Sequence, residues 1–485
     1  MKKNHFIMSA LLFCGLSVFT ACSDVKDNPV PEPPVPTVNE RAVFEEQFSK
    51  DLQAMADGFR FEAAMKTTFS LSEFIMQLDA ESLSKNISQI LSSLISGLQA
   101  KTLDEYSDQD KTHITNLLKS RFNMTDQDIQ AMNGIFVVDA YNSIGKMKLN
   151  FKDGSCEFGQ ADAFTIVSTN MSNETKTIAL KFNDERDGLL FFVTRMGSNP
   201  IAIQLPKSIG VTMTTAQGEI VNGTLELTTA SEGQSKFVSF KESAWVANVK
   251  LTANVNSRQE SVSLYAKHTE QRAFDLKAAF DIQGKEMLRF ECNDMHDAYS
   301  EDEINSEEFK SLREMGPFFS AAYDVLRVLQ GKSVDNVQIT ANDNMVITGK
   351  VDDIAKSLIA LGNVRKLHGT KPGKEVVDQY TQQLNGLVHF TVSQKNTGIN
   401  ANGTLMTAQK DMQDGEYQPA LALQFEGETE AQVVLDRMTD TDKANYKAAM
   451  DNFSQLTKEI SQVLIAAREK GKAILDAVKG SLSIK

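Results

Sequence analysis

The feature that most restricts the fold of this chain is residues 134–293, where short segments of alternating apolar and polar residues follow one another with few residues between them. Residues 177–182 and 189–194 flank a polar loop suited to a hairpin, and residues 211–215 and 220–228 flank a second turn. The pattern continues in four more segments, at residues 245–255, 261–268, 274–282 and 286–291. Connections this short cannot hold the crossover that parallel strands require, so the pattern predicts an antiparallel sheet.

Helical patterns flank this β-rich segment on both sides. Apolar residues recur every three or four positions in residues 41–133 and again in residues 294–332. Residues 333–427 mix helical patterns with strands, including hairpin strands at 337–339 and 345–348, and a C-terminal helical segment follows at 428–485. Segregated helices and strands predict an α+β fold. It has a large antiparallel β-sheet with N-terminal helices, a mixed helical/β second half and a long C-terminal helix.

The C-terminal helix is predicted at about residues 442–479 and carries apolar residues at near-heptad spacing. These residues are Tyr446, Met450, Phe453, Ile460, Leu464, Ala467, Ile474 and Val478. A coiled-coil partner is one interpretation of this stripe. Docking on the protein's own sheet or N-terminal helices is the favoured one.

The first residues have the features of an export signal. Lys2 and Lys3 precede an apolar run from Phe6 to Phe19, which is shorter than the roughly 20 residues that a membrane-spanning helix needs. The run ends in Phe19-Thr20-Ala21-Cys22. This ending resembles the lipobox of bacterial lipoproteins, although Phe19 stands where the family usually has Leu. The resemblance covers only the leader.

The lipoprotein resemblance implies that residues 1–21 are a signal peptide and that Cys22 becomes the acylated first residue of the mature chain. Two or more acyl chains anchor a protein stably. The resemblance therefore implies that the N-terminus of the mature chain is attached to a membrane. Ser23 after the cysteine is similar to the signal for delivery to the outer membrane, and residues 24–27 resemble signals for surface exposure. The expected location is therefore the cell envelope, as an outer-membrane lipoprotein.

Residues 22–40 are predicted to be a tether. Residues 28–36 contain five of the ten prolines of the chain, which favours an extended polyproline II conformation over helix or sheet.

Composition excludes some classes of partner. The formal net charge is −14 and no cluster of Lys and Arg stands out, which argues against nucleic-acid binding. The chain has 28 Phe but only 8 Tyr and one Trp, Trp245, so it has few of the amphipathic rings that suit exposed glycan-binding platforms. Glycan binding is therefore not expected.

Two cysteines, Cys156 and Cys292, remain once the leader is removed and Cys22 is acylated. An oxidising envelope permits a disulfide between them, and two reduced, buried thiols are the equal alternative.

No strong catalytic or cofactor-binding motif occurs in the sequence. The densest group of ligand-type residues is Cys292, Asp294, His296 and Asp297, of which His296, Asp294 and Asp297 are weak candidates for metal ligands. The favoured interpretation is that Asp294 and Asp297 are turn and cap residues where a strand gives way to a helix. We expect no cofactor.

Three classes of function stay open. The first is a non-enzymatic envelope lipoprotein that binds a protein partner or supports an assembly. The second is a carrier or chaperone for a lipid or other apolar ligand. The third and least favoured is an enzyme with an active site assembled from dispersed residues. An apolar cavity under the sheet would favour the second class, whereas a closed core with an exposed apolar patch would favour the first.

Overall fold

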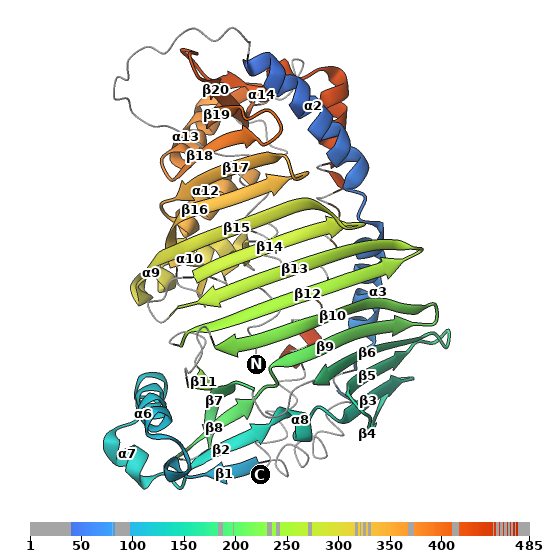
Figure 1. Cartoon of the computed structure of the whole chain (residues 1–485), viewed down its shortest axis with the longest axis vertical. Helices are drawn as coiled ribbons and strands as arrows, with labels where there is room; N and C mark the ends of the chain where they lie inside the picture. The colour runs from blue at the N-terminus through green and yellow to red at the C-terminus, as the bar shows by residue number, and fades with distance from the viewer. Residues whose placement is uncertain are drawn as a thin grey trace. The chain divides into compact units, whose positions relative to one another are not determined.

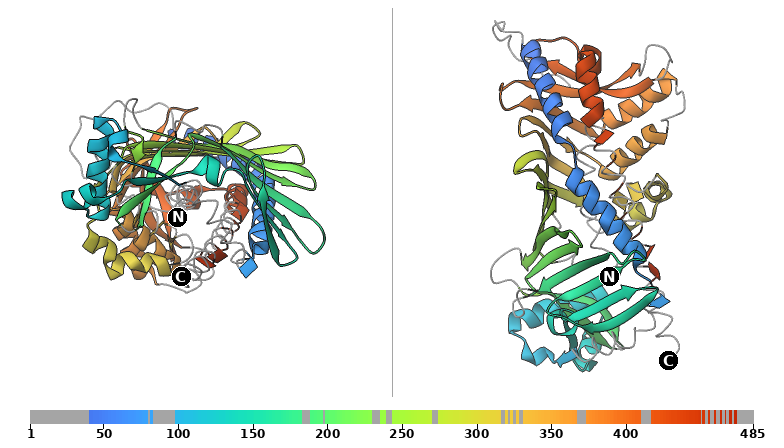
Figure 2. Two further views of the ribbon diagram at one scale, coloured as in Figure 1. Left: turned by 90° about the horizontal axis from the view of Figure 1, so that it is seen from below. Right: turned by 90° about the vertical axis from the view of Figure 1, so that its right-hand side faces the viewer.

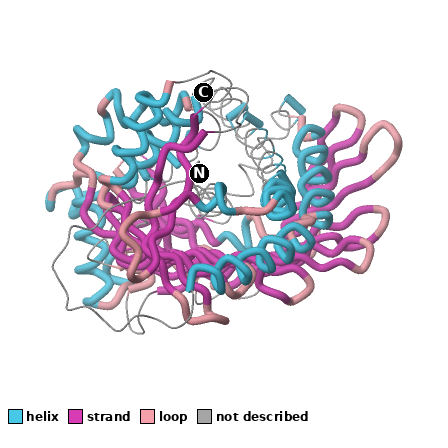
Figure 3. Tube along the Cα trace, turned by 90° about the horizontal axis from the view of Figure 1, so that it is seen from above, coloured by secondary structure: helices cyan, strands magenta, loops and turns pink. Residues whose placement is uncertain are grey.

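The computed structural model has a mixed α+β fold in which strands of a large, mostly antiparallel sheet are the main component, as predicted (Figure 3). The structure describes residues 40–79, 81–82, 98–182, 188–196, 198–229, 235–238, 243–269, 274–315, 319–320, 322–323, 326–327, 331–366, 373–409 and 417–449, and part of 451–473. The leader, Cys22 and the tether therefore lie outside the described residues.

The chain divides into two compact units. Unit 1 contains Glu62–Arg272 and Gln462–Lys485, and unit 2 contains Lys3–Phe61 and Ala273–Ser461. Both units combine segments from distant parts of the sequence.

The main sheet strands of unit 1 lie in the order β13-β12-β10-β9-β6-β5-β3-β4. Their bounds are β3 Met147–Lys152, β4 Ser155–Gln160, β5 Phe164–Thr169, β6 Thr175–Phe182, β9 Ser208–Thr215, β10 Gly218–Thr229, β12 Trp245–Val255 and β13 Arg258–His268. All neighbours are antiparallel except β3 and β5, which are parallel. The predicted hairpin of residues 211–215 and 220–228 is confirmed, since β9 pairs with β10.

The predicted hairpin of residues 177–182 and 189–194 is wrong. β6 pairs with β5 and β9, whereas β7 (Leu190–Met196) pairs with β8 (Asn199–Gln204) in a second sheet. The physical reason is that Phe191 and Phe192 are consecutive and both buried, at 3% and 2% exposure. A strand with a buried side chain on each face needs cover on both sides.

The second sheet has the order β1-β2-β8-β7-β11. Its remaining strands are β1 Leu98–Lys101, β2 Ile135–Asp139 and β11 Phe237–Val238. One face packs against α6 (Asp108–Phe122) and α7 (Asp126–Ala131), with Phe192 and Phe237 stacked in the core between them. The short helices η2 (Leu103–Glu105) and α8 (Ala140–Ser143) connect the elements around it.

Helix α3 (Glu62–Gln77) lies across the main sheet of unit 1 and contacts β5, β12 and β13 (Figure 2). Its buried Phe74 and Ile75 pack against Met213 of the sheet. The backbone amides of Ala63 and Ala64 donate to the carboxylate of Glu260 over 3.2 and 2.7 Å. A carboxylate from β13 thus satisfies two of the free amides at the start of α3.

The sheet strands of unit 2 follow one another in sequence order (Figure 1). Their bounds are β14 Phe274–Ile282, β15 Lys285–Ala298, β16 Gly331–Ala341, β17 Met345–Val351, β18 Val388–Gln394, β19 Asn400–Gln409, β20 Tyr417–Phe425 and β21 Gln432–Val433. Every neighbouring pair is antiparallel, and the predicted hairpin around residues 337–348 is β16 with β17. The strands align one apolar row of paired residues, which runs through Ala278, Phe290, Ile339, Ile347, Val392, Ala401 and Phe425.

Helix α2 (Glu40–Gly58) covers part of this apolar face. Phe44 meets Phe425 edge to face, with ring centroids 5.2 Å apart, and the Gln394 side chain donates to the Phe44 carbonyl over 3.0 Å. At the first turn, the Arg41 guanidinium donates to both carboxylate oxygens of Glu428, each over 2.6 Å. Apolar packing and charged hydrogen bonds therefore hold the same helix in register on the sheet.

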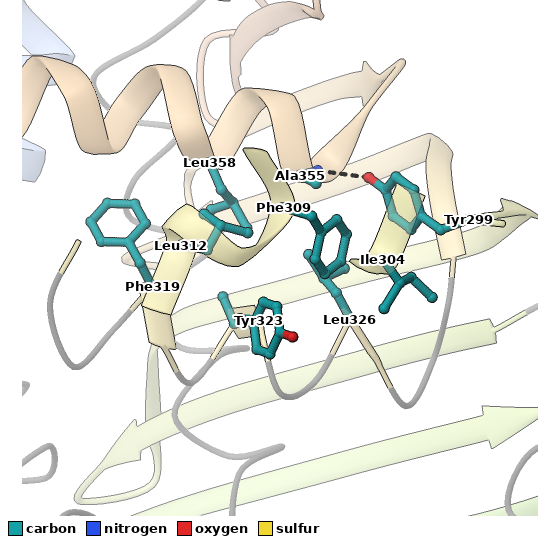
Figure 4. Close-up of a cluster of buried hydrophobic side chains, with 10 residues drawn as sticks. Tyr299, Ile304, Phe309, Leu312, Phe319, Tyr323, Leu326, Ala355 and Leu358 are labelled. Carbon is teal, nitrogen blue, oxygen red and sulfur yellow. Dashed lines mark hydrogen bonds between the residues drawn. The ribbon is translucent and has the colours of Figure 1, made fainter. Parts of the chain in front are cut away.

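Of the remaining helices described in unit 2, α9 (Glu301–Asn305), α10 (Glu307–Ser311), η3 (Leu312–Glu314) and α12 (Ile354–Lys366) contribute residues to a second apolar cluster. Helix α13 (Lys374–Asn385) packs on β19 and β20, and α14 (Val434–Arg437) packs on β20. In the cluster, Phe309 packs between Tyr299 and Tyr323 (Figure 4). The Tyr299 hydroxyl donates to Asp353 over 2.8 Å and accepts from the Ala355 amide over 2.7 Å, which joins the cluster to the start of α12.

Near the C-terminus, residues 440–449 are helical, and the described residues between 451 and 473 are helical as well. In unit 1, Val463 is buried against Phe74, Ile75, Met213 and Ile220. This part of the helix therefore docks on the protein's own sheet and on α3. Of the stripe named from the sequence, only Tyr446 lies among the described residues.

Candidate functional site

The group around His296 lies in the last residues of strand β15, shortly before α9 begins at Glu301, and the residue that caps this helix is Ser300. Asp294 and Asp297 have left-handed backbone angles, with φ of 57° and 51°. The pairing of β14 with β15 is irregular close to Asp294, between Cys292 and Met295. The expected role of Asp294 and Asp297 as turn and cap residues is therefore wrong. Asp tolerates left-handed backbone better than most residues, so it suits an irregular position inside a strand.

The side chain of His296 faces two carboxylates. Its Nε2 atom lies 3.8 Å from Asp297 Oδ2 and 3.8 Å from Asp335 Oδ2, and its Nδ1 atom is 2.6 Å from the Asp294 carbonyl oxygen. The hydrogen bond to Asp294, together with the nearby carboxylates, raises the pKa of His296. Protonation of the imidazole is therefore favoured in this group.

A metal site at His296 is not supported by this geometry. Asp294 meets His296 through its backbone carbonyl, and Asp297 Oδ2 already accepts a hydrogen bond from Ser333 over 3.0 Å. Within the described parts of the chain, no group of three or more His, Cys, Asp or Glu is placed to hold a metal ion. The His296 group has the character of an exposed cluster of charged and polar side chains.

The other described histidines are each bound to their own neighbours. His113 Nε2 lies 2.8 Å from the Phe237 carbonyl oxygen, and His268 Nδ1 lies 2.7 Å from the Ser243 carbonyl oxygen. His389 Nε2 lies 3.3 Å from Asp352 Oδ2. His368 lies outside the described residues. Each of the described histidines thus stabilises its own part of the fold, and they do not come together in one site.

Cys156 and Cys292 are both buried thiols, and the disulfide that the sequence permits is not formed in this structure. Cys156 packs with Leu149 and Phe151 in unit 1, and Cys292 lies on the apolar face of β15 in unit 2. Burial raises the pKa of Cys156 to about 11. A thiol with such a pKa is a poor nucleophile at neutral pH.

An exposed apolar stripe lies on the outer face of α3. Phe69 and Met76, seven residues apart, are 59% and 68% exposed. Residues with this spacing lie on the same face of a helix, here opposite the face that buries Phe74 and Ile75. Sequence reasoning missed this stripe. The available signal was that residues 62–77 contain more apolar side chains than one buried face can hold.

The apolar face of the unit 2 sheet contains a small cavity between β16, β17 and β18. This cavity, lined mainly by Val337, Ile339, Ile347, Val388 and Phe390, has a volume of about 10 Å³. That is room for about one water molecule and too little for an acyl chain.

The sheet face of unit 1 is less completely covered. Leu180, Val211, Leu251 and Val262 form a row across its strands, and each is only partly buried. This face contains aliphatic side chains that remain accessible in the structure.

No protein-family model, curated protein or solved structure matches this chain. Of the helices that the structure describes, none combines the length and apolar character needed to cross a membrane.

Proposed function

We propose that this protein is an exported, lipid-anchored envelope protein that acts by binding a protein partner or supporting an assembly, without catalysis of its own. The observation that carries this proposal is the exposed stripe of Phe69 and Met76 on α3, on the side of the helix opposite Phe74 and Ile75, which pack on the sheet. The envelope location and the anchor at Cys22 rest on the leader alone.

The stripe supports partner binding for an energetic reason. Burying a Phe or Met side chain that would otherwise face water stabilises a complex by about 1.5–3 kcal/mol. Both residue types are enriched in the centres of protein interfaces. A partner with an apolar helix or sheet surface would shield Phe69 and Met76 from water.

Native mass spectrometry of the protein purified from its own cells tests the proposal. We expect a co-purifying protein whose occupancy falls several-fold in the double variant Phe69→Ser, Met76→Ser. Met406→Ser is the matched control, because Met406 is also an exposed Met, at 41%, but lies on β19 of unit 2, whereas α3 belongs to unit 1. Equal occupancy in the double variant and in the control would contradict the role of α3.

The second candidate is a carrier for a lipid or other apolar ligand. The partly buried row of Leu180, Val211, Leu251 and Val262 favours it, because an aliphatic surface without charge suits a hydrocarbon chain. In the same measurement, a bound lipid without a bound protein would favour this candidate.

A further inference from the structure

The sequence contains four Asn-Gly dipeptides, which are chemically fragile. They are Asn133-Gly134, Asn222-Gly223, Asn385-Gly386 and Asn402-Gly403. In such a pair, the backbone nitrogen of Gly can attack the side-chain carbonyl carbon of Asn, because Gly has no side chain to hinder the approach. The reaction needs the Asn side chain and the following amide to be free to meet. The structure therefore decides which of the four dipeptides can react.

Two of the dipeptides are held inside strands with neighbours on both sides. Asn222-Gly223 of β10 pairs with β9 and β12, and Asn402-Gly403 of β19 pairs with β18 and β20. Asn402 has an exposed side chain, but its backbone is fixed in the sheet. Extended, doubly paired backbone cannot turn the Gly nitrogen toward the preceding side chain.

The third dipeptide is held by hydrogen bonds at the end of α13. The Asn385 side chain donates to the Leu405 carbonyl over 3.0 Å and accepts from the Leu405 amide over 3.1 Å. The Gly386 amide donates to the Gln382 carbonyl over 3.0 Å. The Asn385 side chain and the Gly386 amide are therefore both held by hydrogen bonds and are not free to react.

The fourth dipeptide has neither restraint. Asn133 is exposed, Gly134 is buried beside the backbone of Lys101, and the two lie between the end of α7 at Ala131 and the start of β2 at Ile135. Its backbone amide donates to Asn199 Oδ1 over 2.8 Å. Within the described part of the chain, neither the Asn133 side-chain amide nor the Gly134 N–H has a hydrogen-bond partner. The Gly134 nitrogen and the Asn133 side-chain carbonyl that it would attack are therefore not held by hydrogen bonds.

We propose that Asn133 is a site of spontaneous deamidation in the folded protein. Hydroxide removes the proton of the Gly134 nitrogen, which then forms a bond to Asn133 Cγ. The Cγ–Nδ2 bond breaks, and the amide nitrogen leaves as ammonia after taking a proton from water. Water then opens the cyclic imide at either carbonyl, which leaves aspartate or isoaspartate at position 133. Each event adds one negative charge to the loop between α7 and β2.

Peptide mass spectrometry of the purified full chain, aged at mildly alkaline pH, tests the proposal. Digestion with pepsin at acidic pH prevents further deamidation during sample preparation. We expect the Asn133 peptide to convert at least several-fold faster than the peptides with Asn222, Asn385 and Asn402. In a parallel sample aged in denaturant, all four should convert at comparable rates, since the fold no longer protects three of them. Asn133→Gln should abolish the fast conversion.

Two results would overturn the proposal. One is that Asn133 in the folded protein keeps its amide as long as the other three. The other is that the peptide with Asn222 or Asn402 converts as fast as the peptide with Asn133 while the protein stays folded.

Discussion

Gly223 and Gly403 occupy matching places in the two copies of the tetrapeptide Asn-Gly-Thr-Leu, at residues 222–225 and 402–405. Gly223 lies opposite Leu251 of the following strand, and Gly403 lies opposite Leu423. A Cβ atom at Gly403 would lie 2.2 Å from the ring of Phe390. Each glycine is therefore required by close packing inside a sheet.

We predict that Gly403→Ala destabilises the protein by about 1–3 kcal/mol, because the added methyl group overpacks the sheet face beside Phe390. Gly159→Ala on the edge strand β4 is the matched control, since no atom lies within 4 Å of a Cβ built there. Urea denaturation followed by circular dichroism measures both. Equal midpoints for the two variants would show that the contact with Phe390 is unimportant.

We predict that Cys156 and Cys292 react very slowly with an aromatic disulfide reagent in the native protein and rapidly in denaturant. Both side chains are buried, and the raised pKa of Cys156 keeps the thiolate scarce at neutral pH. The absorbance of the released thiolate follows the reaction. No release in denaturant without a reductant would instead mean that the two cysteines form the disulfide.

Helix α9 depends on a charged cap. The Glu303 carboxylate accepts from the Ser300 amide and from Lys332 Nζ, each over 2.8 Å. These hydrogen bonds, that to Lys332 first, lower the pKa of Glu303 to about 2. Because the pKa is lower in the folded state, the stabilisation is complete above the ordinary pKa of 4.5 and is lost as pH falls from there to about 2.

We predict that Glu303→Gln reduces the loss of stability between about pH 4.5 and pH 2 relative to the wild type. The effect is small, because the Glu303 side chain is 43% exposed and solvent screens its interaction with Lys332. Glu301→Gln, in the same helix, is the control. Thermal denaturation across this pH range gives the comparison, and parallel profiles for wild type and Glu303→Gln would contradict it.

The expected attachment of the protein to a membrane depends on one residue, Cys22. Cys14 lies inside the apolar leader, and Cys156 and Cys292 are buried in the folded body, so the resemblance to lipoproteins leaves only Cys22 for acylation. We predict that Cys22→Ala abolishes incorporation of a clickable fatty acid and shifts the protein out of the detergent phase. Wild type without label, or labelled Cys22→Ala, would remove the anchor and the envelope location with it.

The α+β class and several hairpins were predictable because they depend on local information. Strict alternation and short turns place β9 beside β10 and β16 beside β17 with few residues between them. The candidate site was less predictable. The residues around His296 are close in sequence, but Asp335 comes from another strand, and the irregular backbone of β15 is set by its pairing with β14.

Only the tertiary structure separated β6 from β7, since pairing between strands is decided by which apolar faces need cover. It also decided which apolar residues of α3 face water. Periodicity marks Phe69, Phe74 and Met76 as apolar positions on a helix, but only the packing of α3 on its sheet buries Phe74 and leaves the other two exposed. Burial depends on long-range contacts that no local pattern contains.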